Sequence, residues 1–242
     1  MGSELGTLYI VGTPIGNLGD ISPRAVGILR RVKLIATENP QRTQRLSARY
    51  EIRTPMMRFT DAYDRKKHRR IQAVLAALAE GDVALVSEAG MPGLADPGFE
   101  LLQAVLERGI PVTPVPGPTA LTAALAVAGI SVDRFIFLGF LPRGRGARRD
   151  LLGSVAGKPF ALVAYESPHR LLSTLEDLAQ LPGQRFVAVA YELTKLYEEV
   201  QRGTARELLE YFRDHLPRGE FTLVIAPPSN ASLLQEEGEE VK

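Results

Sequence analysis

Residues 83–99 read VALVSEAGMPGLADPGF, and this stretch indicates how the chain is organised. It begins with four apolar residues, a run typical of a strand buried on both faces of a parallel sheet. The remainder is a loop with three glycines and two prolines, more turn residues than a strand-to-helix connection needs. Glycine lets a ligand approach the backbone, and ligands of open α/β sheets bind beyond the carboxyl ends of the strands. We therefore expect a binding site at this loop.

The composition is that of an ordinary globular protein, with 45% hydrophobic and 24% charged residues and a formal net charge of +1 over 242 residues. No apolar run approaches the ~20 residues that span a bilayer, and the N-terminus lacks a signal-peptide pattern. The absence of cysteine excludes disulfides and a thiol nucleophile, and His68, His169 and His215 lack metal-ligand spacing. We expect a cytoplasmic protein with no metal site and no membrane partner.

Alternating strand and helix patterns predict the α/β class, as two α/β domains with mostly parallel sheets. In the first half the expected strands are 8–11, 34–37, 55–59, 83–86 and 110–115, and the expected helices are 22–31, 64–80 and 97–108. In the second half the expected strands are 135–139, 160–165, 186–191, 198–201 and 221–226, and the expected helices are 120–128, 148 onward, 169–181 and 204–215. The proline-rich joint at Pro116 predicts domains at 1–116 and 117–228, followed by a disordered acidic tail at 229–242.

Unusual loops follow five of the predicted strands. They are Thr13–Asn17, Ser87–Gly98, Pro116–Ala120, Tyr165–Arg170 and Glu192–Lys195. Two sheet edges carrying such loops would enclose a cleft, which is a common position for a ligand. The chain has neither a phosphate-binding Walker loop nor the glycine pattern of a dinucleotide fold.

These loops resemble those of the tetrapyrrole-methylase superfamily. The stretches Tyr165–Arg170 and Glu192–Leu196 are similar, more narrowly, to its cytidine 2′-O-methyltransferases that act on 16S ribosomal RNA. The likeness runs from about Gly6 to Ala226. It implies S-adenosyl-L-methionine bound in the cleft between two domains, 16S rRNA of the small ribosomal subunit as substrate, and a homodimer.

The resemblance also implies a set of residues that hold the cofactor. They are Pro14, Gly16, Ser87, Glu88, Ala89, Gly90, Pro116, Gly117, Pro118, Thr119, Ala120 and Leu121. The chain departs from the family pattern in having Glu88 for the usual aspartate, Met91 for threonine, Asn39-Pro40 for Asp-Thr, and Tyr191 for arginine.

Methyl transfer to a hydroxyl needs in-line placement, worth up to ~7–11 kcal/mol, and a group that takes the hydroxyl proton. Lys195, Glu166 and Glu192 follow predicted strands of the second half and are the candidate catalytic residues. A lysine qualifies only if burial lowers its pKa well below ~10.4. The alternative is that Lys195 and Glu192 form a structural ion pair or contact phosphate.

Four arginines, Arg143, Arg145, Arg148 and Arg149, lie in a stretch that also holds two glycines. A flexible basic loop of this kind suits the phosphates of non-helical RNA, and we expect these residues and Arg170 to bind RNA. The alternative is an ordinary solvated connection. Residues 65–70 form a second basic segment that could extend the same surface.

Three functions remain open at this point. The main hypothesis is a metal-independent RNA 2′-O-methyltransferase that uses S-adenosylmethionine. The second is a methyltransferase of the same superfamily acting on a carbon of a corrinoid precursor, against which the arginine-rich stretch argues. The third is a non-enzymatic RNA-binding protein, which cofactor calorimetry would separate from the other two.

Overall fold

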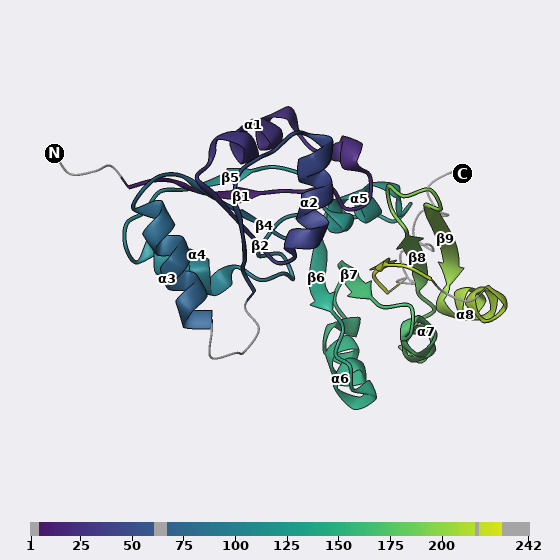
Figure 1. Cartoon of the computed structure of the whole chain (residues 1–242). Coiled ribbons are helices and arrows are strands. Elements are labelled where there is room, and N and C mark those ends of the chain that lie inside the picture. Colours follow the sequence, from purple (N-terminus) through teal and green to yellow (C-terminus); the bar gives the residue numbers. More distant parts are fainter. Residues whose placement is uncertain (1–4, 61–66, 216–217, 229–242) are drawn as a thin grey trace, which may run out of the picture. The chain divides into compact units, whose positions relative to one another are not determined.

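The computed structural model describes residues 5–60, 67–215 and 218–228. The chain divides into two compact units, Met1–Ala120 and Leu121–Lys242, and each is described by itself (Figure 1). The tail predicted at 229–242, and Arg65 and Lys66 of the second basic segment, lie outside the described residues. Within the described ranges, no helix is long and apolar enough to cross a membrane.

The first unit is built on a five-stranded sheet in which every pairing is parallel. Its strands are β1 (Leu8–Val11), β2 (Leu34–Thr37), β3 (Met56–Arg58), β4 (Val83–Val86) and β5 (Val112–Val115). They are ordered β3-β2-β4-β1-β5, which places β4 at the centre with all four of its residues buried. The strand predicted to be buried on both faces is confirmed.

Helices cover both faces of this sheet (Figure 1). Helices α1 (Pro23–Arg31) and α2 (Pro40–Arg49) pack on the face that carries Ala84 and Val86. Helices α3 (Lys67–Leu78) and α4 (Phe99–Leu106) pack on the face of Val83 and Leu85, because successive strand side chains alternate between faces. The sequence analysis missed α2, although Asn39 caps it and proline stands at its first position.

The carboxyl ends of the neighbouring strands β1 and β4 lie where the connections of this sheet diverge to opposite faces. These strands are neighbours, but the chain leaving β1 continues to α1 on one face and the chain leaving β4 continues to α4 on the other. Loops that diverge in this way at neighbouring strand ends are the usual position of ligands in open α/β sheets.

The second unit contains a mixed five-stranded sheet. Its strands are β6 (Phe135–Phe140), β7 (Ala161–Glu166), β8 (Phe186–Tyr191), β9 (Glu199–Thr204) and β10 (Phe221–Ile225), in the order β6-β7-β10-β8-β9. The α/β class is confirmed, but only the β6–β7 pairing of this sheet is parallel within the described residues. The expectation of mostly parallel pairing therefore fails here, because the short connection from β8 to β9 contains no helix and reverses the chain direction.

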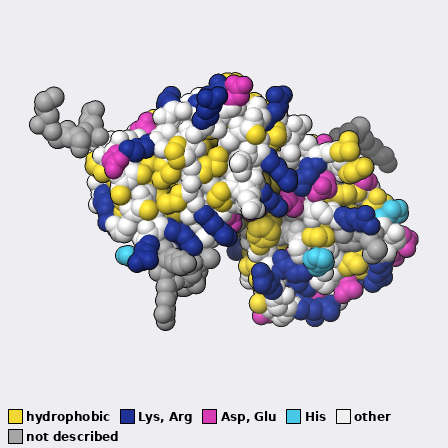
Figure 2. Space-filling model, viewed as in Figure 1, with side chains coloured by type: hydrophobic (Ala, Val, Ile, Leu, Met, Phe, Trp, Pro, Cys, Tyr) yellow, Lys and Arg dark blue, Asp and Glu magenta, His cyan; other side chains and the backbone are white. Residues whose placement is uncertain are grey.

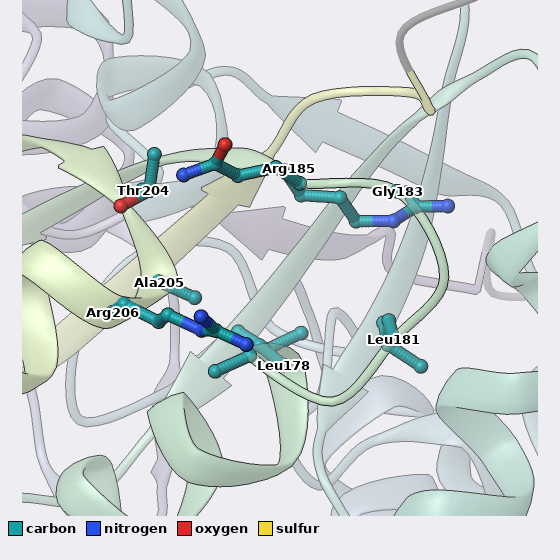
Figure 3. Close-up of a pocket in the computed structure, with 9 residues that line it drawn as sticks. Leu178, Leu181, Gly183, Arg185, Thr204, Ala205 and Arg206 are labelled. Atoms are coloured by element: carbon teal, nitrogen blue, oxygen red, sulfur yellow. The ribbon is translucent and has the colours of Figure 1, made fainter.

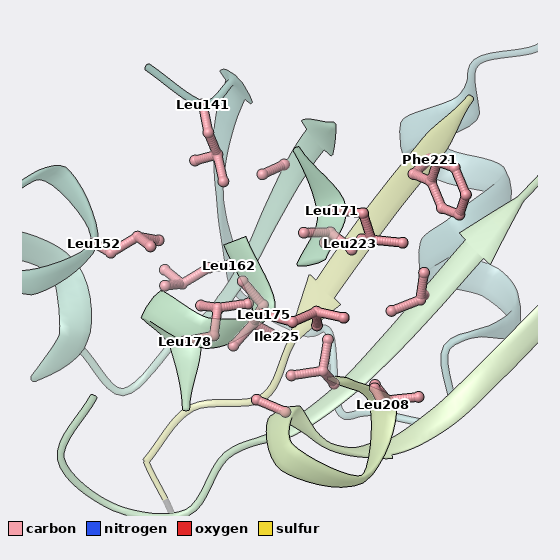
Figure 4. Packing of buried hydrophobic residues seen from close by; sticks show 14 of the residues in the cluster. Leu141, Leu152, Leu162, Leu171, Leu175, Leu178, Leu208, Phe221, Leu223 and Ile225 are labelled. Atoms are coloured by element: carbon pink, nitrogen blue, oxygen red, sulfur yellow. The ribbon is translucent and has the colours of Figure 1, made fainter. Parts of the chain in front are cut away.

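Four helices accompany this sheet: α5 (Ala120–Val127), α6 (Arg145–Ala156), α7 (Leu171–Leu178) and α8 (Ala205–Asp214). Leu152 of α6, Leu175 of α7 and Leu208 of α8 pack together over the sheet residues Leu162 and Leu223 (Figure 4). All five side chains are buried and belong to one continuous core. This core fixes α6 and α7 side by side, which matters for the arginines described below.

Candidate functional site

The first loop of the candidate site is joined to the second by a pair of backbone hydrogen bonds. Thr13 N donates to Gly90 O at 2.9 Å, and Gly90 N donates to Thr13 O at 3.0 Å. The Ser87 hydroxyl is buried beneath this bridge and donates to Ala89 O at 3.2 Å. The loops that follow β1 and β4 are thus held against each other at the edge of the sheet.

The third loop approaches the first through two glycines, Gly12 and Gly117. Gly12 N donates to Val115 O at 3.0 Å, which continues the pairing of β1 with β5. A Cβ atom on Gly117 would lie 2.7 Å from the carbonyl carbon of Gly12, closer than real Cβ atoms come to other atoms. Only glycine fits at this contact. The sequence analysis did not select Gly12, because nothing near it in the chain reveals a partner 105 residues away.

Gly90 has a left-handed backbone, with φ of +81°. A Cβ atom there would lie 3.6 Å from Ile15 Cγ2 and from Pro118 O, which are ordinary contacts. A side chain at position 90 is therefore opposed by backbone conformation, which costs L-residues roughly 1–2 kcal/mol, and much less by space.

Three carboxylates gather near these loops: Glu38 after β2, and Glu88 and Asp96 in the loop after β4. Burial raises the pKa of Glu38, and the charge of Glu88 adds to this rise. Burial likewise raises the pKa of Asp96 to about 6; the hydrogen bond from Ser87 lowers it, and the charges of the two glutamates raise it further. This edge therefore concentrates negative charge, although the sequence analysis had selected only Glu88.

Glu88 is held in place by neighbours at the end of β2. Asn39 Nδ2 donates to its Oε1 at 2.8 Å, and Arg42 Nη1 lies 2.8 Å from its Oε2. In the described part of the chain, no group of three or more histidine, aspartate or glutamate side chains is arranged to hold a metal ion.

The remaining predicted cofactor residues also follow the strands of the first sheet. Pro14 is buried, Gly16 is exposed, and Pro116 to Ala120 continue from β5. Leu121 is the first residue of the second unit and is buried in α5. The sheet thus brings together, within the first unit, three loops that are far apart in the sequence.

Glu166, at the end of β7, is buried and fully engaged by its neighbours. Its Oε1 accepts from Ser167 N at 2.7 Å and pairs with Arg170, and its Oε2 accepts from Thr174 Oγ1 at 2.7 Å. These contacts tie β7 to the start of α7. Arg170 also donates through Nη1 to Leu141 O at 2.9 Å, so both residues hold the loop together.

The loop after β8 is strained and contains the other two catalytic candidates. Glu192 and Thr194 have left-handed backbones, with φ of +50° and +66°, which costs energy in residues other than glycine. Lys195 Nζ lies 2.9 Å from Glu192 Oε1 and 3.2 Å from Glu220 Oε2. Burial lowers the pKa of Lys195, but the hydrogen bonds and charges of these carboxylates outweigh it and leave the pKa raised. This direction is opposite to the lowered pKa that the sequence analysis required of Lys195 as a proton acceptor.

The arginine-rich stretch is not a flexible loop, and this corrects the prediction. Residues 145–149 are the first five residues of α6, and Arg145, Arg148 and Arg149 converge on the buried carboxylate of Asp177 in α7. Arg148 is 2% exposed and lies 2.6 Å from Asp177 Oδ2, so it cannot reach RNA. Burial raises the pKa of Asp177, but the hydrogen bonds from Arg149, Arg148 and Arg145 lower it by more than burial raises it. The pKa of this carboxyl is therefore below its ordinary value. Figure 2 shows basic side chains gathered over the region of α6 and α7.

Comparisons with known proteins show the family to which this chain belongs. Residues 7–209 match the family model of the tetrapyrrole (corrin/porphyrin) methylases. The chain is 48% identical over 224 residues to ribosomal RNA small subunit methyltransferase I of Synechocystis, covering 92% of this chain and 79% of that one. It is 47% identical over 223 residues to the protein of the same name from Thermotoga maritima, covering 92% and 99%.

Solved structures show the same fold at low sequence identity. A cobalt precorrin-4 methyltransferase matches with a TM-score of 0.67 at 18% identity, covering 93% of this chain and 96% of that one. Uroporphyrin-III C-methyltransferase from Thermus thermophilus, complexed with S-adenosyl homocysteine, matches with a TM-score of 0.65 at 18% identity, covering 90% and 97%. Because the family model covers most of the chain and the sequence relatives span nearly all of it, this protein belongs to the tetrapyrrole (corrin/porphyrin) methylase family.

Proposed function

We propose that this protein transfers a methyl group from S-adenosyl-L-methionine to the 2′-hydroxyl of a cytidine in 16S rRNA of the small ribosomal subunit. It acts in the cytoplasm as a homodimer. The observation that carries this proposal is the 47–48% identity, over 92% of the chain, to relatives named ribosomal RNA small subunit methyltransferase I.

The edge of the first sheet suits the cofactor in charge and in shape. S-adenosylmethionine carries a positive sulfonium and an ammonium group, and Glu38, Glu88 and Asp96 supply opposite charge near the loops. The close contact of Gly12 with Gly117 leaves backbone groups, without side-chain bulk, to face a ligand. We assign cofactor binding to Pro14, Gly16, Ser87–Gly90 and Pro116–Leu121.

The cofactor supplies an electrophilic methyl group, and the protein has to place the acceptor oxygen and receive its proton. Of the three candidates, Glu192 fits this task best. Its Oε1 accepts from Lys195 and from Glu220 N, whereas Oε2 has no hydrogen bond among the described residues. We assign Glu192 as the group that accepts the 2′-hydroxyl proton. Lys195 holds this carboxylate in position, and Glu166 with Arg170 shapes the neighbouring loop.

RNA binding is assigned to exposed arginines around the start of α6. Arg143 is exposed, and the side chains of Arg145 and Arg149 remain about half exposed while they contact Asp177. Guanidinium groups already held by a carboxylate on one side are pre-organised to meet phosphates on the other. Arg148 is excluded by its burial, and Arg170 is assigned to positioning.

The test is incubation of the protein with methyl-labelled cofactor and small subunits that lack the modification. Label should appear at a cytidine whose phosphodiester step resists alkali, because 2′-O-methylation removes the attacking hydroxyl. Glu192→Gln should bind cofactor normally and lose methyl transfer. Label without a resistant step would refute the 2′-O assignment, and cofactor binding without labelled RNA would favour the corrinoid alternative.

A further inference from the structure

The two most exposed large apolar side chains among the described residues are neighbours in the chain, Leu196 and Tyr197. They are 88% and 76% exposed, and Tyr197 is the only exposed tyrosine of the described residues. Both lie in the loop that joins β8 to β9, which also contains Glu192. A single apolar side chain on a surface needs no explanation, but an adjacent pair beside a candidate catalytic group indicates a contact surface.

The backbone of this loop is held by its own hydrogen bonds. Its base is closed because Tyr191 at the end of β8 pairs with Glu199 at the start of β9. Two successive turns follow, in which Lys195 N donates to Glu192 O at 2.9 Å and Glu198 N donates to Lys195 O at 3.1 Å. The two exposed apolar residues are the central residues of the second turn. The loop therefore presents them to solvent from a fixed backbone.

We propose that Tyr197 stacks on a cytosine base of the substrate RNA, with Leu196 packing beside it. This inference rests on the proposed methyl transfer to RNA. Glu192, five residues earlier in the same closed loop, is assigned to the 2′-hydroxyl, so the base on the same ribose comes close to this loop. Unstacked bases of single-stranded RNA are commonly bound by stacking on aromatic side chains. A tyrosine ring has only two side-chain torsions, so stacking costs it little conformational entropy.

The opposite edge of the same sheet supplies the control position. It carries a pocket of about 300 Å³ between the end of α7, the residues before β8 and the start of α8 (Figure 3). Arg185 lines this pocket, but its side chain extends away from Thr204 and Arg206, so the pocket does not bring these polar groups together (Figure 3). Phe186 begins β8 at this edge and is 41% exposed. The six-residue strand separates Phe186 from Glu192 by roughly 20 Å.

The first experiment measures methyl transfer to small subunits that lack the modification. Tyr197→Ala should lower kcat/KM for the subunit by about 5- to 150-fold, the range for loss of one base stack, and leave the affinity for S-adenosylhomocysteine unchanged. Tyr197→Phe keeps the ring and should restore most of this loss. Phe186→Ala removes an exposed aromatic ring from the opposite edge and should leave kcat/KM unchanged. Wild-type kcat/KM in Tyr197→Ala would overturn the proposal.

The second experiment detects the stack without methyl transfer. The chain contains no tryptophan, so the fluorescence of Tyr197→Trp reports on that position alone. Oligocytidylate should quench this fluorescence, an abasic sugar–phosphate oligomer of the same length should not, and neither should quench Phe186→Trp.

Three results would overturn the proposal. They are no quenching by oligocytidylate, equal quenching by both oligomers, which would indicate a phosphate contact, and sedimentation of Tyr197→Ala as a monomer where the wild type is a dimer, which would assign the ring to a contact between copies. Methyl transfer without quenching refutes only this inference, whereas quenching without methyl transfer refutes only the proposed function.

Discussion

The contact of Gly12 with Gly117 makes Gly117→Ala the sharpest perturbation of the proposed cofactor site. The new Cβ would lie 2.7 Å from the carbonyl carbon of Gly12, whereas ordinary contacts begin at 3.4 Å. The two loops would have to separate by at least 0.7 Å, the difference between these distances. The atoms that the new Cβ would meet belong to the backbone of Gly12, so no side chain can rotate away to relieve the clash.

The expected cost follows from this forced separation. Overpacking of this kind costs about 1–3 kcal/mol, and each kcal/mol corresponds to roughly 2–4 °C in melting temperature for a chain of this size. Gly12 N also donates to Val115 O, so the shift strains the last pairing of β1 with β5. Because the cofactor is proposed to bind these backbones, we expect its affinity to fall at least about tenfold.

The assay combines thermal unfolding with calorimetric titration of S-adenosylhomocysteine. Gly27→Ala is the matched control, since Gly27 is an exposed residue of α1 and a Cβ atom added there would meet nothing within 4 Å. Alanine should stabilise that helix by up to about 1 kcal/mol and leave cofactor affinity unchanged. Gly117→Ala with wild-type affinity and melting temperature would show that the loops separate freely, and our account of this site would be wrong.

Three other predictions follow from particular side chains. Asp177→Ala should destabilise the protein to urea by about 3–5 kcal/mol, because it leaves a buried arginine without its carboxylate; a loss below about 1 kcal/mol would contradict this. Cofactor affinity should fall as pH falls through about 6, because protonation of Asp96 removes negative charge from the edge; titrations of Asp96→Asn should lack this dependence, and an identical profile in that variant would exclude Asp96. Replacing both Arg145 and Arg149 with alanine should reduce the salt slope of RNA binding by about 1.4, at ~0.7 per lost contact, and an unchanged slope would remove them from the RNA surface.

The sequence was sufficient to predict the strands of the first sheet, because these strands are short apolar runs separated by helical patterns. Residues 83–86 are buried on both faces, as a central parallel strand requires. The second sheet was harder to predict, because the periodicity of apolar residues indicates a strand but not whether it runs parallel or antiparallel to its neighbour. One connection without a helix, between β8 and β9, reverses the direction of the strands that follow. A local pattern cannot distinguish that connection from another loop at a strand end.

Individual site residues were predictable only where their own neighbours in the sequence revealed them. The loop at Ser87–Gly90 is recognisable from its turn residues. Arg148 was misassigned because its partner Asp177 is 29 residues away, and only packing of α6 against α7 brings them together. A cluster of arginines has the same composition whether it faces solvent or surrounds a buried carboxylate. Side-chain burial, not charge density, separates these cases.

Backbone strain supports the catalytic role that we propose for the loop after β8 more directly than charge does. Glu192 keeps a left-handed conformation because its surroundings hold it: its N–H donates to Glu220 O, and its carboxylate accepts from Lys195. Gly219 makes room for that carboxylate, since a Cβ there would overlap Glu192 Oε1. Lys195, three residues further along the same loop, and Gly219 with Glu220, from a segment distant in the sequence, therefore fix the Glu192 carboxylate before any substrate is bound. Holding one side chain in this way costs folding free energy, because the backbone of Glu192 stays in a strained conformation. This cost is expected for a group that must meet a reacting hydroxyl, and not for an ion pair that only stabilises a loop.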